Sequence, residues 1–166
     1  MKKTLISLLV IAAFMMTCMG VAQAAQDSLD ITVTISSISI SVGDDWDIGI
    51  MDLDDTKATT GGQFTVTNSG TSNTPVDLDI IGGDSTSGTP NWTIQPSNGP
   101  DEFVLECQGG LLTSWTSLHS SQNLQNNVGI GGSATFDLQL TTPISDSSSA
   151  DLQTIPVTVT ASIAGS

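Results

Sequence analysis

Apolar and polar residues alternate along most of this chain, in short runs separated by clusters of Gly, Pro, Asn, Asp and Ser. Successive side chains of a β-strand point to opposite faces, so alternation is typical of a strand with one buried face. Thr, Ser and Asp supply most of the polar partners, and the branched Thr side chain packs well on a pleated surface. We expect about nine strands, at Leu29–Ile35, Ile38–Val42, Trp46–Ile50, Phe64–Val66, Val76–Ile80, Trp92–Ile94, Phe103–Cys107, Ala134–Leu140 and Ile155–Ile163.

These runs predict an all-β fold. Short alternating strands joined by turns are typical of an antiparallel β-sandwich, of immunoglobulin-like or jelly-roll-like type. The one helix candidate is a Ser/Thr-rich stretch in which Leu111, Trp115 and Leu118 are spaced three to four residues apart. No linker divides the chain, so we expect a single β-sandwich domain over residues 25–166.

The first 24 residues have the layout of a bacterial secretory signal peptide. Lys2-Lys3 carries positive charge, the stretch Leu5–Met16 is apolar, and Ala22-Gln23-Ala24 supplies small residues for a cut before residue 25. The apolar stretch is shorter than the roughly 20 residues that a membrane anchor needs, which disfavours an anchor. Lipoprotein processing at Cys18 needs a small residue directly before the cysteine, and Thr17 occupies that position. We therefore expect a secreted protein, extracellular or on the cell surface, with no membrane span after cleavage.

The chain is strongly acidic, with 17 Asp and Glu against three Lys. Removing residues 1–24 leaves Lys57 as the only Lys and changes the formal net charge from −14 to −16. Binding to nucleic-acid phosphates depends on Lys and Arg, so we expect no nucleic-acid partner. Electrostatic attraction to anionic lipid is excluded for the same reason.

Six acids gather in one short stretch and are candidates for calcium binding. Ca²⁺ takes six to eight oxygen ligands, and like charges repel one another unless a cation lies between them. The spacing matches no EF-hand loop, and a solvated acidic loop with no bound ion explains the same pattern. The candidate ligands are Asp44, Asp45, Asp47, Asp52, Asp54 and Asp55.

The nucleophiles and aromatic residues favour a protein that is not an enzyme. The alternation places Cys107 on the same face as Phe103 and Leu105, so we expect a buried structural thiol, with an intermolecular disulfide as the alternative. His119 is the single His, in a Ser-rich loop, and no nucleophile-elbow pattern accompanies it. Trp46 and Trp92 alternate with Ile and are expected in the core, whereas Trp115 is a candidate surface contact.

The segment Asp27–Val42 is a long alternating stretch without Gly or Pro. The alternation changes phase at Ser36-Ser37, which marks a bulge or a strand that crosses between sheets. A strand of this kind can complete the sandwich of a neighbouring molecule by β-strand addition, or it can pair within its own domain. The residues proposed for such an assembly strand are Leu29, Ile31, Val33 and Ile35.

Two short patterns resemble known extracellular domains. The segment Gly62–Gly70 followed by Pro75–Leu78 is similar to the strand, Asn-x-Gly turn, strand hairpin of bacterial immunoglobulin-like surface domains. Asn91–Ile94 and Trp115–Leu118 resemble the Trp-x-Leu motifs of Gram-positive wall-associated domains. The resemblance implies a secreted, non-enzymatic sandwich and transfers no binding residue.

Two functions follow as expectations. The first is an exported structural protein, a subunit of an extracellular filament or surface matrix that assembles with copies of itself by β-strand addition. The alternative is a calcium-dependent module that binds a cell-wall polymer or glycan, for which exposed aromatic residues would be the sign.

Overall fold

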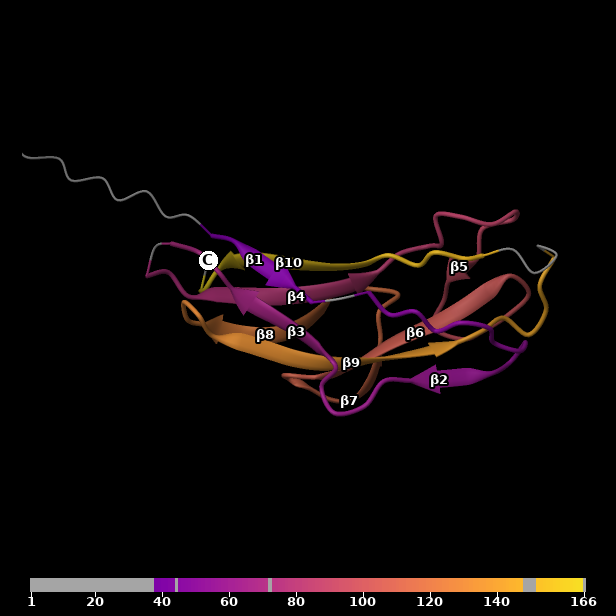
Figure 1. Cartoon of the computed structure of the whole chain (residues 1–166), viewed down its shortest axis with the longest axis horizontal. Helices are drawn as coiled ribbons and strands as arrows, with labels where there is room; N and C mark the ends of the chain where they lie inside the picture. Colours follow the sequence, from indigo (N-terminus) through magenta and orange to yellow (C-terminus); the bar gives the residue numbers. More distant parts are fainter. Residues whose placement is uncertain (1–37, 44, 72, 148–151, 166) are drawn as a thin grey trace, which may run out of the picture. The chain divides into compact units, whose positions relative to one another are not determined.

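A computed structural model describes residues 38–43, 45–71, 73–147 and 152–165. In this part of the chain it contains ten strands and no helix, which confirms the predicted all-β fold (Figure 1). The strands are β1 (Ile40–Val42), β2 (Thr56–Ala58), β3 (Phe64–Asn68), β4 (Val76–Gly82), β5 (Thr93–Ile94), β6 (Glu102–Gly109), β7 (Leu112–Ser117), β8 (Gln122–Val128), β9 (Ser133–Thr141) and β10 (Val157–Ile163).

The strands form two sheets that pack as a β-sandwich. The larger sheet has the order β1-β3-β9-β6-β5, with β2 also paired to β9 and β7 also paired to β6. Its pairs are antiparallel except for the short β5–β6 pair, which is parallel. The smaller sheet has the order β10-β4-β8 and is antiparallel throughout. The predicted antiparallel sandwich is therefore confirmed, with one parallel exception.

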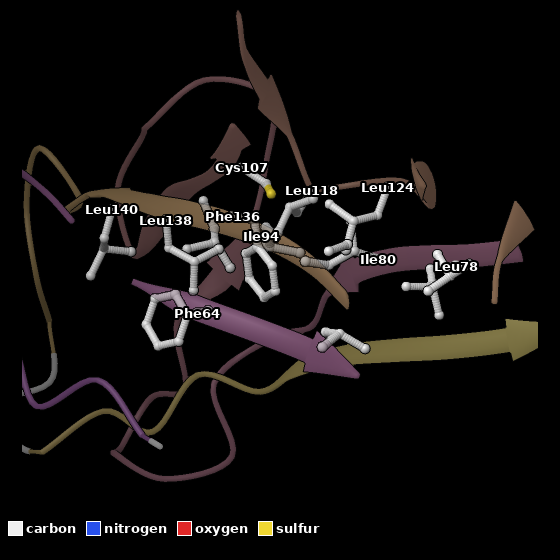
Figure 2. Close-up of a cluster of buried hydrophobic side chains, with 14 of the residues drawn as sticks. Phe64, Leu78, Ile80, Ile94, Cys107, Leu118, Leu124, Phe136, Leu138 and Leu140 are labelled. Atoms are coloured by element: carbon white, nitrogen blue, oxygen red, sulfur yellow. The ribbon is translucent and has the colours of Figure 1, made fainter. Parts of the chain in front are cut away.

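The core lies between the sheets and uses the predicted alternation. On β4, Val76, Leu78 and Ile80 are fully buried, and the residues between them are half-buried. Side chains from both sheets gather in one cluster (Figure 2). The rings of Phe64 and Phe136 stack with their centroids 5.4 Å apart, which ties β3 to β9.

One glycine allows the sheets to approach closely. Gly82 ends β4 at an inward-facing, buried position. A β-carbon added there would lie 2.7 Å from Ile94 Cδ1 and 3.0 Å from Leu105 Cδ2. The close approach requires that no side chain stand at this position.

The stretch predicted as a helix is instead a strand, so that prediction was wrong. Trp115 lies in β7, which pairs with β6 in the larger sheet. Gly109 and Gly110 have positive φ angles of 142° and 56°, and they turn the chain back so that Leu112 lies opposite Gly109. This turn, together with β-branched Thr in the segment, favours a hairpin over a helical turn.

The run Trp46–Ile50 was predicted as a strand and is not one. Trp46 and Ile48 are half-buried and pack against the core, whereas Ile50 is 94% exposed. The segment is irregular, and no described strand pairs with it. The predicted core position of Trp46 is therefore confirmed in part, since the side chain is half-buried. The predicted strand is wrong.

Candidate functional site: an open apolar groove

A groove of about 1220 Å³ lies on one side of the sandwich. Its floor is the inner face of the larger sheet, where Phe64, Phe136 and Leu138 contribute side chains. One wall is the irregular segment 42–53, and the other is the segment that leads into β10. Seven of its lining residues are apolar side chains that pack on the core but stay half-buried: Trp46, Ile48, Met51, Trp92, Ile155, Val157 and Val159.

The strand β10 ends the smaller sheet beside this groove and has, among the described residues, a free edge. The amide of Gly83 donates to the carbonyl of Pro156, and the amide of Ala164 donates to that of Pro75, both at 3.0 Å. In an antiparallel pair, the backbone N–H and C=O groups of every second residue point to the partner strand. Positions 158, 160 and 162 therefore make the hydrogen bonds to β4. Positions 157, 159, 161 and 163 turn their N–H and C=O groups to the opposite edge, which no described strand covers.

The same alternate residues of β10 turn their side chains inward. Val157, Val159 and Ala161 pack against the core and remain half-buried, and Ile163 is 45% exposed. Among the described residues, the backbone donors and acceptors on this edge therefore have no strand partner, and they lie next to an apolar surface that is incompletely covered. An exposed edge of this type is a template for another strand.

The strand β1 borders the sandwich on the larger sheet and is also incompletely covered. Val42 lies opposite Val66 in the register of β1 and β3, so both side chains share the inner face. Val66 is fully buried, yet Val42 is 51% exposed. Ile38, two positions before β1 begins its pairing with β3 at Ile40, is 40% exposed.

Hydrogen bonds hold the irregular wall in place. The Lys57 ammonium donates to the carbonyl of Ile50 at 2.7 Å and to that of Ile48 at 3.4 Å. The hydroxyl of Thr142, in the loop after β9, donates to the carbonyl of Asp52 at 2.7 Å. Segment 45–53 is thus tied to the larger sheet through its backbone, which keeps the groove open beside it.

The proposed assembly residues Leu29, Ile31, Val33 and Ile35, like the phase change at Ser36-Ser37, lie outside the described residues. The structure therefore describes the groove and the free edge but not this segment. The assembly strand stays a prediction.

Three residues of the acidic stretch, Asp45, Asp47 and Asp52, line the same wall of the groove. Asp44 lies outside the described residues; the other five candidates are Asp45, Asp47, Asp52, Asp54 and Asp55. Within the described part of the chain, no group of three or more His, Cys, Asp or Glu is placed to hold a metal ion. Calcium binding remains a prediction from the sequence.

Three of these acids accept hydrogen bonds from nearby groups. Asp47 accepts from the amide of Gly49 at 3.0 Å, and Asp55 from the amide of Thr56 at 2.8 Å. Asp54 has a φ of 56° and accepts from the side-chain amide of Asn98 at 2.8 Å. These contacts shape the turns before and after the wall segment.

Cys107 lies on β6 with no exposed surface, in the core cluster. Burial, with a smaller contribution from the negative charge of Asp137, raises the pKa of its thiol from 9.0 to about 12. This position fits the structural thiol predicted from the sequence. An intermolecular disulfide needs a sulfur at the surface, so the folded chain does not present Cys107 for one.

We expect Cys107 to resist a thiol reagent in the folded chain at about pH 8 and to react after unfolding, because only the thiolate attacks. The unfolded thiol loses its proton first as pH rises, so the free energy of unfolding falls from about pH 9 towards pH 12. Urea unfolding of the wild type and Cys107→Ala at about pH 8 and about pH 10 measures this. An equal pH dependence in both proteins would contradict it.

Trp115 is half-buried on β7 and faces away from the core. Its neighbour Thr116 lies opposite the inward-facing Cys107, so Trp115 takes the other face of the larger sheet. His119 is exposed in the turn after β7, where its amide donates to the Ser117 hydroxyl at 3.4 Å. The tryptophan predicted as a surface contact is thus only partly accessible.

A half-buried polar cluster that the sequence analysis did not single out joins the turn before β3 to β9. Asp137 accepts from the amides of Gly62 and Gln63, at 2.8 and 3.1 Å, and from the hydroxyl of Thr59 at 2.9 Å. Burial raises the pKa of Asp137, but these three hydrogen bonds outweigh it, and the pKa lies below its usual value. In the sequence Asp137 looks like any outward residue of an alternating strand.

No helix long and apolar enough to cross a membrane occurs among the residues that the structure covers. Comparisons with known proteins found no matching family model, no similar curated protein and no similar solved structure. The function is therefore argued from the groove and the sequence alone.

Proposed function

We propose that this chain is an exported structural protein, a subunit that assembles outside the cell into a filament or surface matrix by β-strand addition. The observation that carries the proposal is the free edge of β10 beside the open apolar groove. A sandwich with a free edge and an incompletely covered core gains stability when a further strand covers both.

The sequence supplies a strand of the required kind. Segment Asp27–Val42 contains apolar residues at period two and no Gly or Pro, and it begins close to the expected cleavage site. Strand addition uses main-chain hydrogen bonds for affinity and alternate side chains for specificity. The high negative charge of the chain opposes unspecific pairing of edges.

Electron microscopy of the purified chain Ala25–Ser166 tests this proposal. We expect filaments or an ordered matrix without any added glycan, and a folded but non-assembling chain after deletion of Ala25–Ile35. Circular dichroism checks that the deletion variant keeps its strands. Filaments formed by the deletion variant would contradict strand addition. A wild-type chain that stays monomeric and binds wall polymer would favour the calcium-dependent binding module instead.

A further inference from the structure

The free edge of β10 has a definite length and a definite inner face. Four residues of β10 present backbone N–H and C=O groups to the free edge and side chains to the interior: Val157, Val159, Ala161 and Ile163. They span seven residues, or roughly 20 Å of extended chain. A strand that pairs here would place alternate side chains over the half-buried residues of the groove.

One segment of this chain matches the edge in length and pattern. Leu29–Ile35 is also seven residues long, with apolar side chains at its odd positions and Asp30, Thr32 and Thr34 between them. Paired with β10, it would direct four apolar side chains inward and three polar ones to solvent. The inward side chains would cover the groove at Val157 and Val159 and the incompletely buried Ala161 and Ile163 beyond it. The match therefore extends to both faces of the strand.

The phase of the alternation favours a segment from another molecule. In the same chain, Ile38 and Ile40 continue the pattern on the even positions, and only Ser36 and Ser37 separate the two sets. Burying both sets within one molecule would require the chain to cross between sheets about 10 Å apart. The three Cα steps from Ile35 to Ile38 span roughly that distance only when the link is fully extended. A neighbouring copy can supply the apolar side chains of Leu29–Ile35 without this constraint.

We infer that Leu29–Ile35 of one copy pairs with the free edge of β10 in a second copy, and that Leu29, Ile31, Val33 and Ile35 cover the groove and the inward side chains of β10. This inference rests on the proposed function, because it names the donor, the acceptor and the partner of the same assembly. Trp46, Ile48 and Met51, which line the groove and are half-buried, become covered by the incoming strand.

Disulfide trapping in the chain Ala25–Ser166 tests the inference. Val159→Cys is combined on one chain with Leu29→Cys, Ile31→Cys, Val33→Cys or Ile35→Cys in turn, because opposite residues in paired strands lie within disulfide distance. We expect at least one pair to give a ladder of covalent multimers on a non-reducing gel. Val157→Cys is the second acceptor position if the first variant does not fold.

The matched control moves the donor cysteine to the other face of the strand. Thr32→Cys or Thr34→Cys, each with Val159→Cys, is expected to give at least about tenfold less covalent multimer, because these side chains point away from the groove. Equal ladders from both faces would overturn the inference.

The remaining outcomes separate the inference from the proposed function. Large particles without any trapped pair would overturn the acceptor site and leave strand addition elsewhere in place. A faster-migrating monomer with an internal disulfide would overturn the partner, since the segment would then fill its own groove. Monomers without a trapped pair would overturn both.

Discussion

Replacing Ile31 and Val33 together with Asp is expected to leave the chain folded and to abolish its assembly. Each change would place an ionised carboxylate in an apolar groove, and an unpaired buried charge costs several kcal/mol. Because about 1.4 kcal/mol is a tenfold change in affinity, association falls by orders of magnitude. Light scattering measures the particle mass, and circular dichroism checks the fold.

The matched control is Thr32→Asp with Thr34→Asp, which adds the same charge to the other face of the segment. Assembly should persist in this variant, weakened only by the added repulsion between acidic chains. Loss of assembly in both double variants, or in neither, would contradict a strand that uses alternate residues to fill the groove.

Phe103→Ala is expected to cause the largest loss of stability in the sandwich. Phe103 is the largest of the fully buried side chains and lies on β6. Removing such a side chain costs about 3–5 kcal/mol, a large share of the roughly 5–15 kcal/mol that stabilises a typical domain. Urea unfolding followed by Trp fluorescence measures the loss, in the assembly-defective double variant so that dissociation does not contribute.

Val104→Ala is the control for the core substitution, because Val104 is half-buried on the other face of the same strand. Its truncation should cost less than about 1 kcal/mol. Similar losses for Phe103→Ala and Val104→Ala would contradict the assignment of the inner and outer faces of β6.

The strands with strong alternation could be predicted from the sequence, including which face is buried. Leu78 on β4 and Leu138 on β9 are inward and buried, as their period-two patterns predict. The strand β8 was missed because its sequence is rich in Asn and Gln and only Leu124 and Val128 are buried. Register shifts in its pairing with β4 further break the period.

The groove could not be predicted, because it joins segments that are far apart in the chain. Trp46 and Val159 line the same cavity, and nothing in the local pattern of either segment reports the other. The sequence also does not reveal that Lys57 donates to the backbone carbonyls of Ile48 and Ile50. Strand order and loop anchoring set these features, and both arise from tertiary packing.

The measurement that tests the central claim most directly is the mass in solution of the chain Ala25–Ser166, by light scattering over a range of concentrations with calcium present. A subunit that assembles by strand addition predicts a large particle whose mass rises with concentration. A particle that keeps the mass of a single chain at every concentration would contradict the account.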